Sequence, residues 1–237
     1  MSVVERKRVR NFGVSEIKIH DRKMLLQNEM IKKPIDLTLD REQYIKLYHQ
    51  YEDADALGYY EKSSPEYIRV KNILSSVKKN SLVYDVGCNS GGIGRLLIKQ
   101  KQCQVYGSEI CPSLGEKASE KGLKVFIGWA EHTPYKEEIF DYAILTFILE
   151  HVLDPEMLMK ETMRVVKDRG MIIGHVPTAS GDWGKKTIGR HPEHLRAYNQ
   201  RELKKLLKKS GLHDIQITKI FLIGRTVADY YFFLGRK

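Results

Sequence analysis

Residues 85–94 read Asp-Val-Gly-Cys-Asn-Ser-Gly-Gly-Ile-Gly, and this glycine-rich stretch decides the fold. It overlaps the end of an apolar run at 82–86, typical of a buried strand, and leads into a helical pattern at 93–101. Glycines at such a turn let the backbone approach a ligand closely and direct the amides of the helix N-terminus into the crevice beyond the strand. The stretch therefore predicts a ligand-binding loop.

An acidic residue strengthens this prediction. Glu109 lies 24 residues after Asp85 and follows a second predicted strand at 104–107. A carboxylate has two oxygens, so it can accept hydrogen bonds from both hydroxyls of a ribose. A glycine loop alone also fits a turn that merely needs positive φ, but strand, loop, helix and acid in this order favour a nucleotide-like ligand.

The rest of the chain alternates apolar runs with helical patterns. This alternation implies parallel strands joined by right-handed crossovers. It predicts an α/β fold with a doubly wound, mostly parallel, Rossmann-like sheet of seven strands. Further helices are predicted over 113–121, 155–166 and 200–210, and further strands over 124–127, 142–145, 170–176, 214–223 and 229–235.

The N-terminal part has a different pattern. Residues 12–19 alternate weakly like an edge strand, and helices are predicted over 40–51 and 65–77, which together look like a cap. We therefore expect an N-terminal extension with a helical cap over 1–64 and a ligand-binding domain over 65–237.

Composition excludes several classes. With 237 residues, 42% hydrophobic and 30% charged, the chain can bury an ordinary core, which argues against disorder. No apolar run approaches the roughly 20 residues that span a bilayer, and no hydrophobic segment follows the basic start as in a secretory signal. The cysteines, Cys88, Cys103 and Cys111, are odd in number and lack metal-site spacing, so a cytoplasmic location is expected.

The net charge of +10 is concentrated at the two ends of the chain. Residues 1–35 hold nine Lys and Arg against four Asp and Glu, and residues 185–237 hold thirteen against four, so the middle is slightly acidic. Basic ends of this kind fit either an anionic small acceptor or the phosphates of RNA.

A nicotinamide dinucleotide is the obvious competing ligand for the glycine loop. Its fingerprint G-x-G-x-x-G would place Asn89 at the middle glycine, where pyrophosphate crowds a side chain. The carboxylate of Asp85, two residues before the first glycine, suits a ligand with a positive charge and not a diphosphate. Both observations disfavour the dinucleotide.

With its downstream motifs the chain resembles the class I S-adenosylmethionine-dependent methyltransferases, within the methyltransferase type 11/12-like subgroup. The resemblance runs from about residue 59 to 217. Its motifs are Gly-Trp-Ala-Glu-His-Thr-Pro-Tyr at 128–135, Phe-Asp at 140–141, Leu-Glu-His-Val-Leu-Asp-Pro at 149–155, Arg-Val-Val-Lys-Asp-Arg-Gly at 164–170, Val-Pro at 176–177 and His-Leu-Arg-Ala-Tyr at 194–198.

The resemblance implies S-adenosyl-L-methionine as cofactor and assigns roles by position. Residues of the glycine loop would hold the methionine end, Glu109 the ribose, and residues after the second and third strands the adenine. Phe147 would begin the wall near the methyl group. The implied cofactor-binding residues are Asp85, Gly87, Asn89, Gly91, Glu109, Ile110, Trp129, Ala130, Glu131 and Phe147.

Three positions depart from the family pattern. Asn89 replaces a glycine, although Asn tolerates the left-handed conformation better than most residues. Glu109 replaces the commoner Asp, which changes reach but not chemistry. Trp129 stands where an Asp often meets the adenine amino group, and ring stacking can replace that contact.

Methyl transfer to a protonated oxygen or nitrogen also needs a base. Glu150 and His151 follow the fourth predicted strand, and His194 lies in the long irregular stretch 178–198, predicted to be a substrate loop. These three are the predicted catalytic residues, while His175 is expected in the core. They also resemble the carboxylate-and-histidine set of metal-dependent 2′-O-methyltransferases, but Phe147 replaces the first glutamate of that set, so no metal is predicted.

Three functions remain open. The leading hypothesis is methyl transfer to an oxygen or nitrogen of a small molecule, sugar or lipid intermediate, for which the basic ends favour an anionic group. The alternative is an RNA, in particular a tRNA, methyltransferase, in which the basic residues of 6–10 and the lysines of 204–209 would contact phosphates. The third is a cofactor-binding regulator without catalysis, suggested by Asn89 and Trp129.

Overall fold

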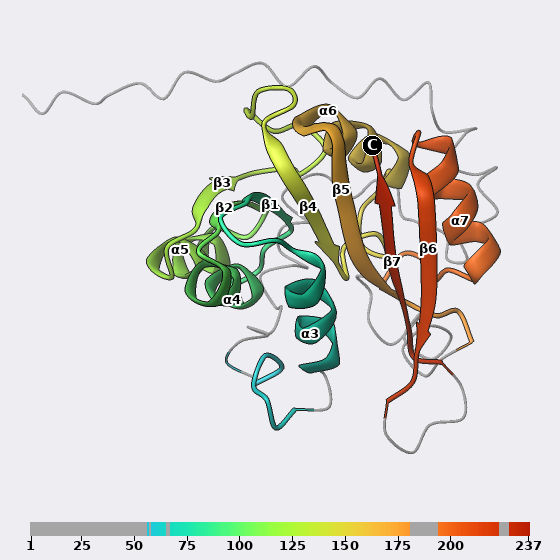
Figure 1. Cartoon of the computed structure of the whole chain (residues 1–237), viewed down its shortest axis with the longest axis horizontal. Coiled ribbons are helices and arrows are strands. Elements are labelled where there is room, and N and C mark those ends of the chain that lie inside the picture. The colour runs from blue at the N-terminus through green and yellow to red at the C-terminus, as the bar shows by residue number, and fades with distance from the viewer. Residues whose placement is uncertain (1–55, 57, 65–66, 181–193, 223–227) are drawn as a thin grey trace, which may run out of the picture.

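The computed structural model describes residues 56, 58–64, 67–180, 194–222 and 228–237, which form a seven-stranded sheet with helices on both faces (Figure 1). The strand order is β3-β2-β1-β4-β5-β7-β6, and β7 alone runs antiparallel to its neighbours. The predicted doubly wound, mostly parallel α/β fold is confirmed. The strands are β1 Leu82–Val86, β2 Gln104–Glu109, β3 Lys124–Ile127, β4 Phe140–Thr146, β5 Val166–Pro177, β6 His213–Ile220 and β7 Tyr230–Arg236.

The described helices divide between the two faces of the sheet. Buried residues of α3, α4 and α5 pack on one face in a single cluster with β1 and β2, while α6 and α7 pack on the other. This division follows from the strand order, because right-handed crossovers that run in opposite directions from β1 and β4 cover opposite faces. The helices are α3 Tyr67–Ser76, α4 Gly92–Lys101, α5 Pro112–Glu120, α6 Pro155–Val165 and α7 Gln200–Lys209.

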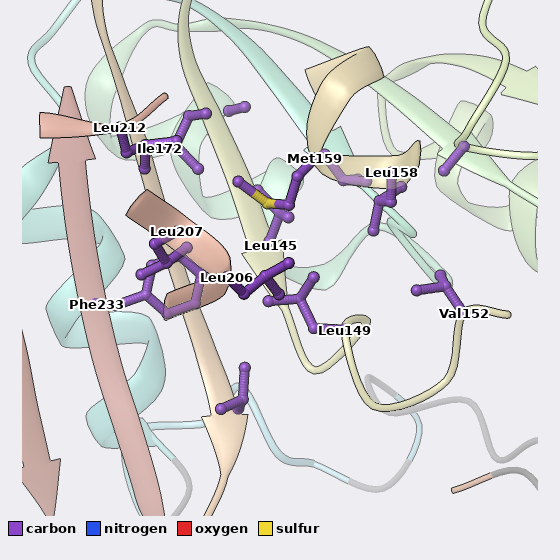
Figure 2. Close-up of a cluster of buried hydrophobic side chains, with 14 of the residues drawn as sticks. Leu145, Leu149, Val152, Leu158, Met159, Ile172, Leu206, Leu207, Leu212 and Phe233 are labelled. Carbon is purple, nitrogen blue, oxygen red and sulfur yellow. The ribbon is translucent and has the colours of Figure 1, made fainter. Parts of the chain in front are cut away.

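The largest core cluster lies between the sheet and the pair α6 and α7 (Figure 2). Leucines of α7 at three- and four-residue spacing point toward the sheet, as the helical period requires. Phe233 of β7 and Leu145 of β4 meet them from the strands. This core fixes the β4–α6 turn and the start of α7, which both border the candidate site.

The helix predicted at 65–77 as part of a cap packs instead against one face of the sheet. Val70, Ile73 and Leu74 of α3 are buried together with Leu97 of α4. The other predicted cap helix, at 40–51, and the edge strand at 12–19 lie outside the described residues. No described helix has the length and apolar character needed to cross a membrane.

The junction between α6 and β5 differs from the sequence prediction. The helix was expected to reach 166 and the strand to begin at 170, but β5 already begins at Val166, which pairs with Phe140. A register shift follows between Phe140 and Tyr142, and Arg169 adopts φ 60°. Such an irregularity lets polar residues continue a strand although their sequence resembles a loop.

Candidate active site

The glycine loop connects β1 to α4 at the carboxyl edge of the sheet. Gly87, Asn89 and Gly91 all have positive φ, at 67°, 49° and 79°. A Cβ on Gly91 would lie 2.9 Å from the backbone of Ala118 in α5, so both conformation and space require glycine there. Asn89 does adopt the left-handed conformation, as expected for an Asn in place of glycine.

Glu109, the last residue of β2, connects the loops around it. Its Oε2 accepts a hydrogen bond from the Asn89 amide at 2.8 Å, and its Oε1 accepts one from the Cys111 amide at 3.0 Å. Its backbone carbonyl accepts another from Gly128 N–H after β3, at 2.8 Å. A carboxylate offers about four acceptor positions, so these bonds orient Glu109 while acceptor capacity for a diol is retained.

Two buried carboxyl groups lie close together at this edge. Burial, and secondarily the neighbouring Glu109, raise the pKa of Asp85 to about 7. Burial also raises the pKa of Glu109, against the hydrogen bonds of its amide neighbours. No described residue donates a hydrogen bond to the Asp85 carboxylate. A cationic ligand would stabilise the ionised form of Asp85, so this pair fits a cofactor that carries positive charge.

The predicted adenine-side residues follow β2 and β3. Ile110 directly follows Glu109 and is partly exposed, and Trp129 is partly buried beside the buried Ala130. Glu131 is buried as well, which raises its pKa to about 7. The carboxyl ends of β2 and β3 therefore bring these residues to the same edge of the sheet as the glycine loop.

Phe147 follows β4 in an unusual conformation. Its φ is 56°, uncommon for a bulky residue, and its amide donates to the carbonyl of His175 on β5 at 3.0 Å. The ring packs edge-on against Tyr230 at 4.8 Å and beneath the guanidinium of Arg69, whose Cζ lies 4.7 Å from the ring centroid. Backbone strain of this kind persists where surrounding contacts hold it, commonly at functional sites.

The three predicted catalytic residues meet at the turn after β4. Glu150 is fully buried, and neither of its carboxylate oxygens has a hydrogen-bond partner. His151 Nε2 lies 3.9 Å from Glu150 Oε1, and the rings of His151 and His194 pack edge-on with centroids 4.7 Å apart. Burial raises the pKa of Glu150 to about 8. Within the described ranges no group of three or more His, Cys, Asp or Glu side chains is placed to hold a metal ion.

Arg196 holds this turn in place. Although charged, its side chain is fully buried and donates to the carbonyls of Leu149, Val152 and Leu153, on both sides of Glu150 and His151. Leu195 N–H donates to the Glu150 carbonyl at 2.9 Å. The motif at 194–198 thus stabilises this turn by hydrogen bonds to its backbone, a role that its sequence did not predict.

The expected substrate loop is described only at its ends. Thr178 bridges to Tyr198, and the amide of Ala179 donates to the Tyr198 carbonyl at 2.7 Å. Residues 181–193, the middle of the predicted substrate loop, lie outside the described residues. His175 is fully buried, as expected for a core histidine.

Residues 63–217 match a family model described as a methyltransferase domain. The chain belongs to the class I S-adenosylmethionine-dependent methyltransferases. The match covers the glycine loop, Glu109 and the turn that holds Glu150, so the predicted family is confirmed, and with it the methyl donor S-adenosyl-L-methionine.

Individual relatives show different acceptors. A tRNA (carboxymethyluridine(34)-5-O)-methyltransferase of Arabidopsis thaliana is 30% identical over 54% of this chain and 32% of its own length. A ubiquinone/menaquinone biosynthesis C-methyltransferase of Rickettsia massiliae is 27% identical over 69% of this chain and 64% of its own length. The chain thus spans less than two thirds of either relative. A Thermotoga maritima structure, a possible histamine N-methyltransferase, superposes with a TM-score of 0.66 at 18% identity, covering 82% of this methyltransferase and 99% of that chain.

Several residues near the site were not predicted. Arg69 and Tyr230 contact Phe147, and Arg69 also lies over the ring of Tyr59. Tyr60 lies against Gly92, where a Cβ would be 2.1 Å from its ring. Aromatic residues just before α3 were the available signal, but a tyrosine in a helical pattern is more often a core residue.

Proposed function

We propose that this methyltransferase acts on an oxygen or nitrogen that loses a proton on methylation, with His151 as general base and Glu150 as its partner. The supporting observation is the buried carboxylate of Glu150, with neither oxygen hydrogen-bonded, 3.9 Å from His151 Nε2. Burial raises the pKa of Glu150 to about 8, so only part of this carboxyl group is ionised near neutral pH. Its ionised form would stabilise the imidazolium that forms when His151 takes a proton.

The cofactor-binding roles are part of the same proposal. S-adenosylmethionine supplies a methyl group bound to a positively charged sulfur, which is electrophilic without activation by the protein. Asp85 would face its positive charge in the ionised form, and Glu109 would accept hydrogen bonds from its ribose hydroxyls. The glycine loop would bring backbone close to the methionine end. Correct alignment of this kind can contribute about 7–11 kcal/mol to a reaction barrier.

The acceptor side would be formed by the turn after β4. His151 would accept the acceptor proton, while the ring of His194 packs against it and restricts its orientation. Arg196 keeps Glu150 and His151 in place through the surrounding carbonyls, so it acts as a positioning residue. Thr146, whose buried Oγ1 has no hydrogen-bond partner, lies at the same end of β4.

The base assignment is tested by single-turnover methyl transfer. His151→Gln should slow transfer by about 10²–10⁴-fold, the usual contribution of a general base, while S-adenosylhomocysteine affinity by calorimetry stays unchanged. His132→Gln, at an exposed position after β3, is the matched control and should retain the wild-type rate. A wild-type rate in the His151 variant would show that the reaction needs no base at this position.

A tRNA acceptor is the second candidate, and one surface favours it. Arg201, Lys204, Lys205 and Lys208 are exposed along α7 and border a shallow hollow together with Lys209, which pairs with Glu156. Nucleic-acid phosphates bind such stripes through charge.

The stripe begins near the candidate active site and extends along α7 to the other end of this helix. β6 runs parallel to β5, since both are antiparallel to β7, so α7 begins at the carboxyl edge, directly after Tyr198. The Arabidopsis relative is named as a tRNA methyltransferase, which agrees with this reading.

Labelled methyl groups distinguish the two acceptor classes. The protein is incubated with labelled cofactor and either total RNA or an RNA-free metabolite extract. Incorporation into RNA would overturn the small-molecule acceptor. In that case we would replace Arg201, Lys204, Lys205 and Lys208 of α7 by glutamine. The plot of log affinity against log salt concentration, which falls as salt rises, should then be less steep by about 3. Glutamine at Lys71, Lys78, Lys79 and Lys99, exposed on the opposite side of the sheet, is the control and should leave the slope nearly unchanged.

A further inference from the structure

A hydrogen-bonded ion pair on α6 holds the segment that connects β3 to β4, residues 128–139. Oε1 of Glu161 accepts hydrogen bonds from the Thr133 amide at 3.0 Å and from the Thr133 hydroxyl at 2.6 Å. Arg164 donates to both carboxylate oxygens of Glu161, from Nε at 2.8 Å and from Nη2 at 2.6 Å. The same Nη2 donates to the backbone carbonyl of Tyr135 at 2.9 Å. The pair therefore fixes this connecting segment at two of its residues.

The sheet holds the same segment from its other side. The hydroxyl of Tyr135 donates to the carbonyl of Gly107 in β2 at 2.6 Å. Gly128 N–H donates to the carbonyl of Glu109, at the end of β2, at 2.8 Å. The ring of Tyr135 packs edge-on against Tyr84 of β1, with the centroids 5.3 Å apart. The connecting segment is thus held between α6 and the sheet.

The bonded residues directly follow the predicted adenine side of the cofactor site. Ala130 and Glu131, which are both buried, precede Thr133 by three and two residues. A backbone that is bonded so close to these residues has few alternative conformations there, so little freedom is lost when a ligand binds. Without these bonds, the ligand would have to order the segment itself.

The charge state of Glu161 favours the bonded arrangement. Its side chain is 10% exposed, and burial by itself raises its pKa. The hydrogen bonds from Arg164 and Thr133 outweigh this effect and hold the pKa of Glu161 below its usual value. Because both carboxylate oxygens are bonded to protein donors, Glu161 acts on the site through the segment that it holds.

We propose that Glu161 and Arg164 are positioning residues for the methyl donor, which hold residues 129–131 in the conformation that binds the adenine of S-adenosylmethionine. Charge-assisted hydrogen bonds are strong, and a carboxylate bonded twice by one guanidinium also has a defined geometry. Support of this kind keeps binding residues in place although the supporting residues do not touch the ligand. The inference rests on the cofactor part of the proposed function, because it requires that residues after β3 contact adenine.

Calorimetric binding of S-adenosylhomocysteine to the full chain tests this role. Glu161→Ala removes the acceptor of both Thr133 bonds, so affinity should fall about 10-fold, the order of the cost of ordering one or two side chains on binding. Glu161→Gln keeps a carbonyl oxygen as acceptor, so it should retain part of the affinity. Glu156→Ala is the control on the same helix, because the partner of Glu156 is Lys209 of α7, and it should bind like wild type.

Variants of Thr133 test whether the ion pair acts through this segment. Thr133→Val removes only the hydroxyl, so it should weaken binding less than Glu161→Ala does, whereas Thr133→Ser keeps the hydroxyl and should bind like wild type. Glu161→Ala combined with Thr133→Val should bind no more weakly than Glu161→Ala alone, because the hydroxyl has already lost its acceptor. Additive losses in the double variant would overturn the inference.

A core variant separates positioning from loss of stability. Leu207 of α7 is fully buried in the core on the α6 and α7 side of the sheet (Figure 2), so Leu207→Ala lowers the free energy of unfolding in urea. It should nevertheless keep wild-type affinity for S-adenosylhomocysteine. Equal loss of affinity in Leu207→Ala and Glu161→Ala, or wild-type affinity in Glu161→Ala, would overturn the inference. If Glu161→Ala does not fold, the comparison of Thr133→Val with Thr133→Ser decides, and equal binding by these two would overturn it.

A fragment of the cofactor shows which part of it is affected. 5′-Methylthioadenosine contains the adenine and the ribose but lacks the amino acid end. Glu161→Ala should weaken its binding by the same factor as that of S-adenosylhomocysteine, and a loss for S-adenosylhomocysteine alone would overturn the inference. No methyl transfer is involved, so the turnover of His151→Gln tests the proposed base separately. Unchanged binding in Asp85→Asn and Glu109→Gln would refute the proposed cofactor roles whatever the result for Glu161.

Discussion

Replacement of Glu150 by glutamine should change how stability depends on pH. In the folded chain the pKa of Glu150 is raised from 4.5 to about 8 because its carboxylate is fully buried without hydrogen bonds. A carboxyl group whose pKa is higher when folded favours folding at low pH, and its contribution is lost as pH rises from the unfolded value toward the folded one. Glutamine has nearly the same shape but does not ionise, so Glu150→Gln removes this loss.

The size of the effect follows from these two values. Each pH unit between them corresponds to about 1.4 kcal/mol for one proton. Between pH 5 and pH 7.5 the wild type should therefore lose about 3 kcal/mol relative to Glu150→Gln. The glutamine amide is itself buried without hydrogen bonds, which destabilises the variant equally at both pH values. The test therefore compares how much the difference in free energy of unfolding changes between pH 5 and pH 7.5.

Urea denaturation of the cofactor-free protein at both pH values measures the difference. Glu161→Gln is the matched control, because Glu161 pairs with Arg164 at 2.6 Å and its pKa is lowered by hydrogen bonds with Arg164 and Thr133. That substitution should destabilise by nearly the same amount at pH 5 and pH 7.5. If wild type and Glu150→Gln differed in free energy of unfolding by the same amount at pH 5 and pH 7.5, the carboxyl group of Glu150 would not be buried without hydrogen bonds.

Three further outcomes are expected. Cofactor affinity should fall about tenfold for each pH unit below 7, because Asp85 must ionise to face a cation, and Asp85→Asn should remove this dependence in calorimetry at pH 5.5–8. Arg196→Met should lower the free energy of unfolding in urea by about 3 kcal/mol, since it leaves three backbone carbonyls without their donor. Gly91→Ala should destabilise by about 1–3 kcal/mol in the same assay, because φ 79° and the Ala118 backbone both oppose a Cβ. Gly122→Ala, which has positive φ but an ordinary contact distance of 3.5 Å, should cost less.

The sequence by itself determined the strand and helix order and the cofactor edge. The reason is that the decisive signals are local. Alternating apolar runs and helical spacing show which face of an element is buried, and the glycines of 87–91 with Glu109 mark two successive strand ends. In a parallel sheet such ends must lie at one edge, so the sequence alone predicts that the loop and the acid lie together.

Tertiary structure alone decided what surrounds the proposed base. Arg196 resembles a surface residue, since an arginine is rarely fully buried, and only the fold shows the carbonyls that accept its donors. Arg69 meets Phe147 and Tyr230 from positions 78 and 161 residues apart along the chain. The periodicity of apolar residues predicts that a side chain is buried. It does not predict which distant side chain it contacts, because such contacts depend on how α3, β4 and β7 pack together. The nature of the acceptor site is therefore a property of packing, whereas the nature of the cofactor site is already visible in the sequence.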